Sequence, residues 1–116
     1  MKIGTDIVAI ARIEKSLEQF GDKFLQRFLH PEEIQIANKT ASIAGFWAAK
    51  EAIAKALGCG IGRELSFHDI YLSKDPKGAP HFRLSESAQQ LHKINNSSLS
   101  ISHDGGFAIA VVAIIS

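Results

Sequence analysis

Several features that would restrict the fold or the location of this chain are scarce. The 116 residues contain one cysteine, so no disulfide within the chain can stabilise the fold, and a reducing compartment such as the cytoplasm is expected. Lysines and arginines number 13 against 12 acidic residues, and the net charge of +1 gives no general attraction to nucleic acid. The composition therefore argues against a disulfide-rich secreted domain and against a nucleic-acid-binding protein.

Long apolar runs are also missing. The N-terminal stretch MKIGTDIVAI is too short and too interrupted for a signal peptide, and no stretch approaches the roughly 20 residues of a membrane span. We therefore expect no membrane partner. Hydrophobic residues nevertheless make up 46% of the chain, which is a surplus for a domain whose small size leaves much surface unburied. An oligomer would cover that surplus in its interfaces.

Hydrophobic periodicity predicts a single α+β domain over residues 1–116, with a mostly antiparallel sheet packed against a long helix. The order is a strand, a run of helices, two strands, a helix and two strands. Strands are predicted at residues 2–8, 67–74, 80–84, 98–102 and 107–115, and helices at 10–20, 22–28, from 31, at 40–57 and 85–94.

The predicted long helix contains charges among apolar residues, in the stretch GFWAAKEAIAKALGCG (residues 45–60). Glu51 and Lys55 are four residues apart, and a simple surface pair would stabilise the helix by about 0.2–0.5 kcal/mol. Trp47 and the surrounding alanines favour a packed site instead, in which a half-buried carboxylate needs a cation. Lys50 points about 100° away from Glu51, and we expect it at the rim of that site.

Asp6 raises the same question in the first predicted strand. It is either a strand-end residue that caps the following turn or a member of the same site. Asp6 and Glu51 would provide two carboxylates from two rigid elements, and Mg²⁺ prefers carboxylates, phosphate oxygens and water. A neighbouring lysine neutralises phosphate charge. The set indicates metal-assisted chemistry at a phosphate ester.

Four segments of the chain, in order, resemble the holo-acyl-carrier-protein synthase family, the small bacterial 4′-phosphopantetheinyl transferases. They are IGTD, FWAAKEAIAKALGCGIG, LSFHDIYLSKDPKGAPHF and SISHDGGFAIAVV. The resemblance implies the fold of that family. It also implies Mg²⁺-dependent transfer of 4′-phosphopantetheine from coenzyme A to a serine of apo acyl carrier protein, with release of adenosine 3′,5′-bisphosphate, in support of fatty acid biosynthesis.

The resemblance also assigns roles to individual residues. Asp6 and Glu51 become metal ligands, and Glu51 ranks lower as a general base because a carboxylate on a metal is weakly basic. Lys55 becomes a catalytic phosphate contact that assists the leaving group or relays a proton. Lys50 and His103 are assigned with Lys55 to coenzyme A binding, although His103 is otherwise an ordinary turn residue. The family is a homotrimer, and His103 is expected to act across a subunit boundary.

Acyl carrier proteins are acidic, so the resemblance implies a basic docking surface. Polar residues with helical spacing would form such a basic surface, as a single polar stripe, if the first two predicted helices are nearly collinear. The alternative is that these residues form an ordinary solvated helix face. Arg12 and Lys15 are the predicted partner-binding residues, with Arg12 preferred because it matches a basic position beside the first family motif. The remaining stripe residues are Gln19, Lys23 and Arg27.

Two positions depart from the family pattern. Phe46 stands where an arginine that helps to hold coenzyme A phosphate is expected, and Lys39 is a possible substitute. Cys59 replaces a common threonine and is interpreted as a packing residue rather than a nucleophile. The missing arginine leaves a non-catalytic coenzyme A or nucleotide-binding module open as an alternative. A metal-dependent hydrolase of small phosphoesters is another, although it would need no basic docking surface.

Overall fold

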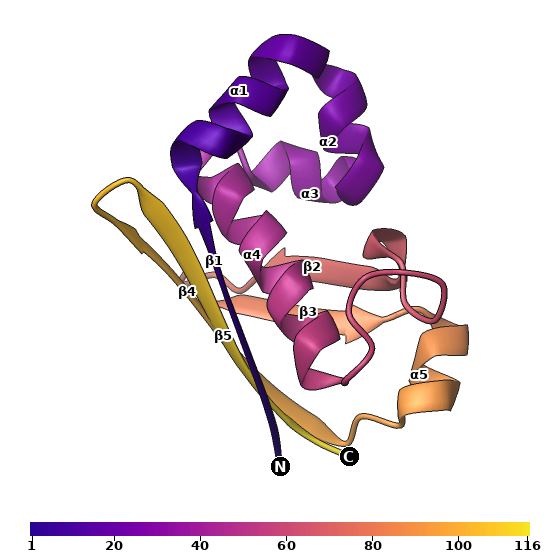
Figure 1. Ribbon diagram of the computed structural model, residues 1–116. Coiled ribbons are helices and arrows are strands. Elements are labelled where there is room, and N and C mark those ends of the chain that lie inside the picture. The colour runs from indigo at the N-terminus through magenta and orange to yellow at the C-terminus, as the bar shows by residue number, and fades with distance from the viewer.

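The computed structural model describes residues 1–116, and its element order confirms the predicted α+β class (Figure 1). The first half contains one strand and four helices: β1 (Lys2–Ala9), α1 (Ile10–Phe20), α2 (Asp22–Phe28), α3 (Pro31–Ile36) and α4 (Thr40–Ala56). The second half contains a 3₁₀ turn, four strands and one helix: η1 (Phe67–Asp69), β2 (Ile70–Lys74), β3 (Pro80–Leu84), α5 (Glu86–His92), β4 (Asn96–Asp104) and β5 (Phe107–Ile115). No helix is both long enough and apolar enough to span a membrane.

The strands form two antiparallel sheets rather than one. One sheet has the order β1-β5-β4, and β2 pairs with β3 in the other. The predicted strand at 67–74 begins three residues late because its first residues form η1. The Asp69 carboxylate accepts hydrogen bonds from the Ser66 backbone N and from the Ser85 hydroxyl, at 2.9 and 2.8 Å, and this keeps residues 67–69 in a turn.

Helix α4 is the centre of the molecule and packs directly on the three-stranded sheet (Figure 1). Its alanines are almost all buried, and so are the inward-facing residues of β5. The closest approach is at Gly4, where an added Cβ would lie 2.0 Å from the Ala52 carbonyl oxygen. Only a glycine permits that contact. Because side chains alternate along β1, Asp6 lies on the same face of the strand as Gly4 and is therefore next to the same helix.

The opposite face of the three-stranded sheet is open, and no helix covers it (Figure 1). Registered pairs such as Ile7–Ile109 and Thr5–Val111 lie on this face, next to serines of β4. Its exposed large apolar residues are Ile3, Ile7, Phe107, Ile109, Val111 and Ile115. We call this surface the open sheet face.

Candidate active site

Asp6 and Lys55 form an ion pair between β1 and α4. The Lys55 Nζ donates to Asp6 Oδ1 at 2.8 Å and to the Thr5 carbonyl oxygen at 3.2 Å. Lys55 therefore binds Asp6, and no hydrogen bond joins it to Glu51 as the surface-pair interpretation required. The Asp6 side chain is 15% exposed and that of Lys55 is 52% exposed, so the pair lies at the edge of the core, open to solvent.

Glu51 lies near this pair, on the same helix, and shares its electrostatic field. Partial burial raises the pKa of Glu51, and the negative charge of Asp6 raises it further, while Lys55 and Arg12 act in the opposite direction. The hydrogen bond to Asp6 raises the pKa of Lys55 and keeps it charged. Two carboxylates that repel each other in a partly buried site are a donor set that fits a divalent cation.

The prediction that Lys50 lies at the rim and contacts coenzyme A is wrong. Its side chain is completely buried, and its ammonium group donates to Glu33 Oε1 at 2.8 Å and to the carbonyl oxygens of Phe28 and Phe67 at 2.7 and 3.1 Å. All three ammonium protons are therefore used inside the protein. These hydrogen bonds link α4 to the surrounding elements, and Lys50 has no N–H donor left for a ligand.

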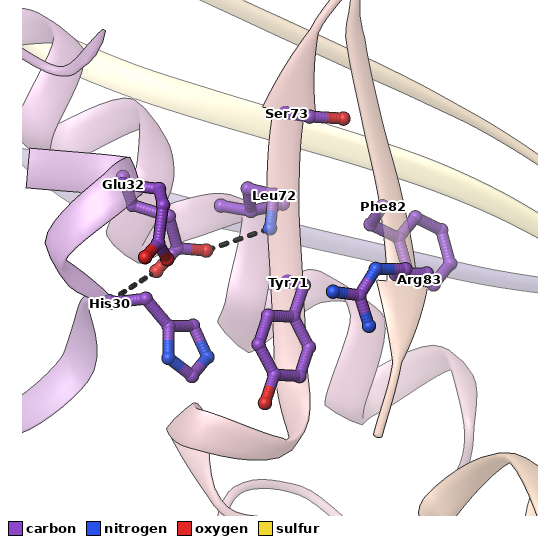
Figure 2. A pocket seen from close by; sticks show the side chains of 8 residues that line it. His30, Glu32, Tyr71, Leu72, Ser73, Phe82 and Arg83 are labelled. Atoms are coloured by element: carbon purple, nitrogen blue, oxygen red, sulfur yellow. Dashed lines mark hydrogen bonds between the residues drawn. The ribbon is translucent and has the colours of Figure 1, made fainter. Parts of the chain in front are cut away.

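Glu33 is the acceptor at the centre of this internal network. Its Oε1 also accepts from the backbone N of His30, and its Oε2 accepts from the backbone N of Leu72, at 2.6 and 2.7 Å. Figure 2 draws these two bonds as dashed lines that end at the labelled residues His30 and Leu72. The two acidic residues after Pro31 indicate a helix start in the sequence, but nothing there shows that one of them is buried. Its partner Lys50 lies 17 residues away, and only the tertiary fold brings the two together.

Arg12 lines a groove of about 480 Å³ between α1, α2 and α4. Its guanidinium carbon is 5.7 Å from the centre of the Trp47 ring, and Arg27 lines the groove from α2. The chain bends at Gly21, so α1 and α2 are not collinear and the predicted continuous stripe does not form (Figure 1). Lys15 is exposed on α1 and does not line the groove.

His103 lies two strands away from the Asp6–Lys55 pair. Asp6 and Ile101 are both in register with Ala110, so β4 lies about 10 Å from β1, across β5. His103 is two residues beyond Ile101, and it lines a small cavity of about 200 Å³ together with Phe46 and Lys74.

The cation next to Phe46 is Lys74, which the sequence did not indicate. The Lys74 Nζ lies 5.7 Å from the centre of the Phe46 ring and lines the same cavity. Lys39 is exposed at the start of α4 and is not among the residues that line this cavity. The position of Lys74, six residues after the pattern LSFH, matches no motif that would predict a contact with Phe46. Only the fold brings the two side chains together.

Comparison with known proteins settles the family. Residues 2–112 match the family model described as the 4′-phosphopantetheinyl transferase superfamily. The chain belongs to the 4′-phosphopantetheinyl transferase superfamily. This confirms the resemblance found in the sequence, and the match includes every segment on which that resemblance depended.

Relatives of this phosphopantetheinyl transferase are similar over nearly their whole lengths. The holo-[acyl-carrier-protein] synthase of Sulfurovum sp. (strain NBC37-1) is 60% identical, with 98% of this chain and 96% of the relative covered. The crystal structure of the Helicobacter pylori synthase in complex with coenzyme A has a TM-score of 0.95 at 57% identity, covering 97% and 99% of the two chains. The synthase of Bacillus anthracis, in complex with CoA (3′,5′-ADP), has a TM-score of 0.82 at 41% identity, covering 97% and 94%.

Proposed function

We infer that this transferase moves the 4′-phosphopantetheine group of coenzyme A to a serine of an apo acyl carrier protein and releases adenosine 3′,5′-bisphosphate. The observation that carries this inference is the Asp6–Lys55 pair beside Glu51, in a superfamily member at 52–60% identity to named synthases. The serine oxygen attacks the β-phosphorus of the pyrophosphate, the bond from that phosphorus to the bridging oxygen breaks, and the serine hydroxyl proton leaves to solvent. We place the reaction in the cytoplasm, in support of fatty acid biosynthesis.

Asp6 and Glu51 are the residues that would hold Mg²⁺. When bound, the ion would neutralise charge on the pyrophosphate oxygens. Lys55 is mostly exposed and keeps its proton, so its ammonium group is available to the phosphate oxygens that gain charge as the bond breaks. Its hydrogen bond to Asp6 orients it toward the same site. Lys55 therefore acts as an electrostatic catalyst that assists the leaving oxygen, since its raised pKa opposes proton transfer.

Lys74 and His103 are proposed to contact the nucleotide half of coenzyme A in the cavity beside Phe46. Lys74 would supply the positive charge that Phe46 lacks. We also propose a homotrimer in which a neighbouring subunit completes each site. The open sheet face would be the interface of that trimer, since it leaves six large apolar residues exposed.

Arg12 and the groove beside it are proposed to receive the acyl carrier protein. Arg12 and Arg27 border an apolar floor that includes Phe20 and Trp47, and this combination fits an acidic helix with an apolar stripe. Lys15 would add long-range attraction from the exposed side of α1. Because these charges are exposed, the association rate should fall as salt rises.

The function is tested by incubating the protein with coenzyme A, Mg²⁺ and an apo carrier protein, then weighing the carrier protein by mass spectrometry. We expect the added arm with the wild-type chain and its loss with Asp6→Asn and Glu51→Gln, while circular dichroism stays unchanged. Glu86→Gln is the matched control, because this carboxylate is exposed at the start of α5.

The same assay separates the alternatives. Coenzyme A that binds without any adenosine 3′,5′-bisphosphate being released would indicate a binding module. Hydrolysed coenzyme A with unmodified carrier protein would indicate a hydrolase and refute the transferase. Normal transfer by Asp6→Asn or Glu51→Gln would contradict the metal assignment alone.

A further inference from the structure

Three side chains with different metal-binding atoms lie close together near the C-terminal end of α4. Cys59 and Glu64 lie in the loop of residues 57–66, which leads from α4 to η1, and His92 is the last residue of α5. The thiol sulfur, a carboxylate oxygen and an imidazole nitrogen all lie within 4.8 Å of one another. Figure 1 shows this loop passing beside α5. None of the three residues belongs to the site proposed for transfer.

His92 supplies a second observation at this cluster. Its side chain is only 8% exposed, and its Nε2 is buried without a hydrogen-bond partner. The nearest acceptor, Glu64 Oε2, is 3.4 Å away, which is beyond the usual N–H···O range. Buried polar atoms are almost always satisfied, so an unpartnered nitrogen that points at a thiol and a carboxylate needs an explanation.

The donor set distinguishes between classes of ion. Thiolate, imidazole and carboxylate together are ligands of Zn²⁺ and related transition metals, whereas Mg²⁺ and Ca²⁺ prefer oxygen alone. A tetrahedral zinc ion holds its ligand atoms about 3.5 Å apart, so the cluster must contract slightly. The loop permits this, because Glu64 is 51% exposed and Gly58 and Gly60, with φ of 82° and 67°, flank Cys59.

The Cys59 thiol donates to the Ala54 carbonyl oxygen, with Sγ and O 3.8 Å apart. Burial raises the pKa of Cys59, and the negative charge of Glu64 raises it further. Binding of a transition-metal ion would therefore form the metal–sulfur bond and release the thiol proton to solvent. Glu64 then changes from a group that opposes thiolate formation into a ligand of the same ion.

We propose that Cys59, Glu64 and His92 form a site for one zinc-class divalent ion, with a water molecule in the fourth position. The site ties the 57–66 loop to α5. The backbone N atoms of Cys59 and Gly60 already donate to the Ala54 carbonyl oxygen, so the ion also fixes the C-terminal end of α4. The ion has a structural role and takes no part in transfer.

The proposal is tested by titrating Co²⁺, a spectroscopic substitute for Zn²⁺, into the full chain after chelation and reduction. We expect one equivalent to produce a near-ultraviolet thiolate-to-cobalt band, which Zn²⁺ then abolishes by displacement, and Zn²⁺ to raise the melting temperature. Cys59→Ser should lose the band. His92→Gln and Glu64→Gln should bind at least about tenfold more weakly.

Matched variants separate this site from the others. His81→Gln removes another histidine that pairs with a carboxylate, Asp75, and should keep the band. Asp6→Asn should also keep the cobalt band, although it loses transfer. The zinc site and the transferase function can therefore fail independently of each other. A folded wild-type chain without a one-to-one band overturns the zinc site. Unchanged affinity in Cys59→Ser and His92→Gln overturns it as well, and if His92→Gln does not fold, Cys59→Ser and Glu64→Gln decide.

Discussion

Two adjacent residues of α4 have opposite surroundings. Lys50 is fully buried and bound to Glu33, whereas Glu51, about 100° further around the helix, lies beside Asp6 at the edge of the core. Helical periodicity predicts correctly that the two diverge. It does not show which direction is inward, because that depends on a carboxylate supplied by another helix.

Glu33→Gln should destabilise the protein by about 3–5 kcal/mol, because it leaves the Lys50 ammonium group buried without a counter-charge. Burial lowers the pKa of Lys50, and Glu33 opposes that shift. In the variant the pKa of Lys50 falls further, so its stability should rise with pH as the buried lysine loses its proton. Urea unfolding at two pH values measures both effects. A midpoint equal to that of the wild type would contradict the role given to this pair, and Glu32→Gln, on the exposed side of α3, is the control.

Asp69 gives the fold a dependence on acid. Hydrogen bonds from the Ser66 backbone and from the Ser85 and Ser66 hydroxyls hold the pKa of Asp69 below its ordinary value of 3.8. This contribution to stability is present above that value and is lost as the pH falls through the lower pKa of the folded state. Asp69→Asn should therefore cost about 1 kcal/mol at neutral pH and flatten the decline below about pH 4. Unfolding curves with the same acid dependence in both proteins would refute this.

At the scale of elements, the contact between β1 and α4 decides where the site is formed. Gly4 has no side chain and therefore leaves space next to Asp6 on the same face of β1. The structure shows that the backbone of α4 fills this space at Ala52 and Ala56. The same close contact therefore brings Asp6 within 2.8 Å of Lys55.

Gly4→Ala should destabilise the protein by more than about 2 kcal/mol and reduce transfer, because the new Cβ would meet helix backbone that cannot move aside locally. Gly45→Ala is the matched control. There an added Cβ would meet the Cγ2 methyl of Ile101 at 2.8 Å, so we expect a smaller loss, because the contact is with a side chain rather than with helix backbone and alanine is the better helix former by about 1 kcal/mol. Thermal unfolding and the transfer assay compare the two, and equal losses would argue against the special role of Gly4.

Local sequence signals predicted the elements well and their long-range partners poorly. The strand with alternating residues at 2–8 and the helix with apolar spacing at 10–20 are confirmed within one residue. The strand at 67–74 starts late because Asp69 bonds to Ser66 and Ser85, and a propensity pattern does not contain that interaction. Lys50 was misplaced and Lys74 was missed for the same reason, because the position of each depends on a partner that is distant in the sequence.

At the scale of the whole molecule, the two faces of the three-stranded sheet are unequal. Helix α4 covers one face, and the other exposes six large apolar side chains on β1 and β5, with serines of β4 beside them. A separate monomer with this surface would be prone to association. Trimerisation would cover the open sheet face and, as proposed above, bring a neighbouring subunit to each site.

Val111→Lys tests this assembly. Val111 is 44% exposed at the centre of the open sheet face, opposite Thr5 and Ser100, so a charge there should not disturb the fold but should oppose burial in an interface. We expect light scattering after gel filtration to show trimers for the wild type and monomers for the variant, with transfer lost. Leu91→Lys also replaces an apolar side chain with lysine, at a 60% exposed position on α5, and should leave the oligomeric state and transfer unchanged. A monomeric variant with full transfer would mean that one subunit contains a complete site. A wild-type chain that is monomeric at micromolar concentration would contradict the trimer, because the open sheet face would then be an ordinary solvent-exposed surface.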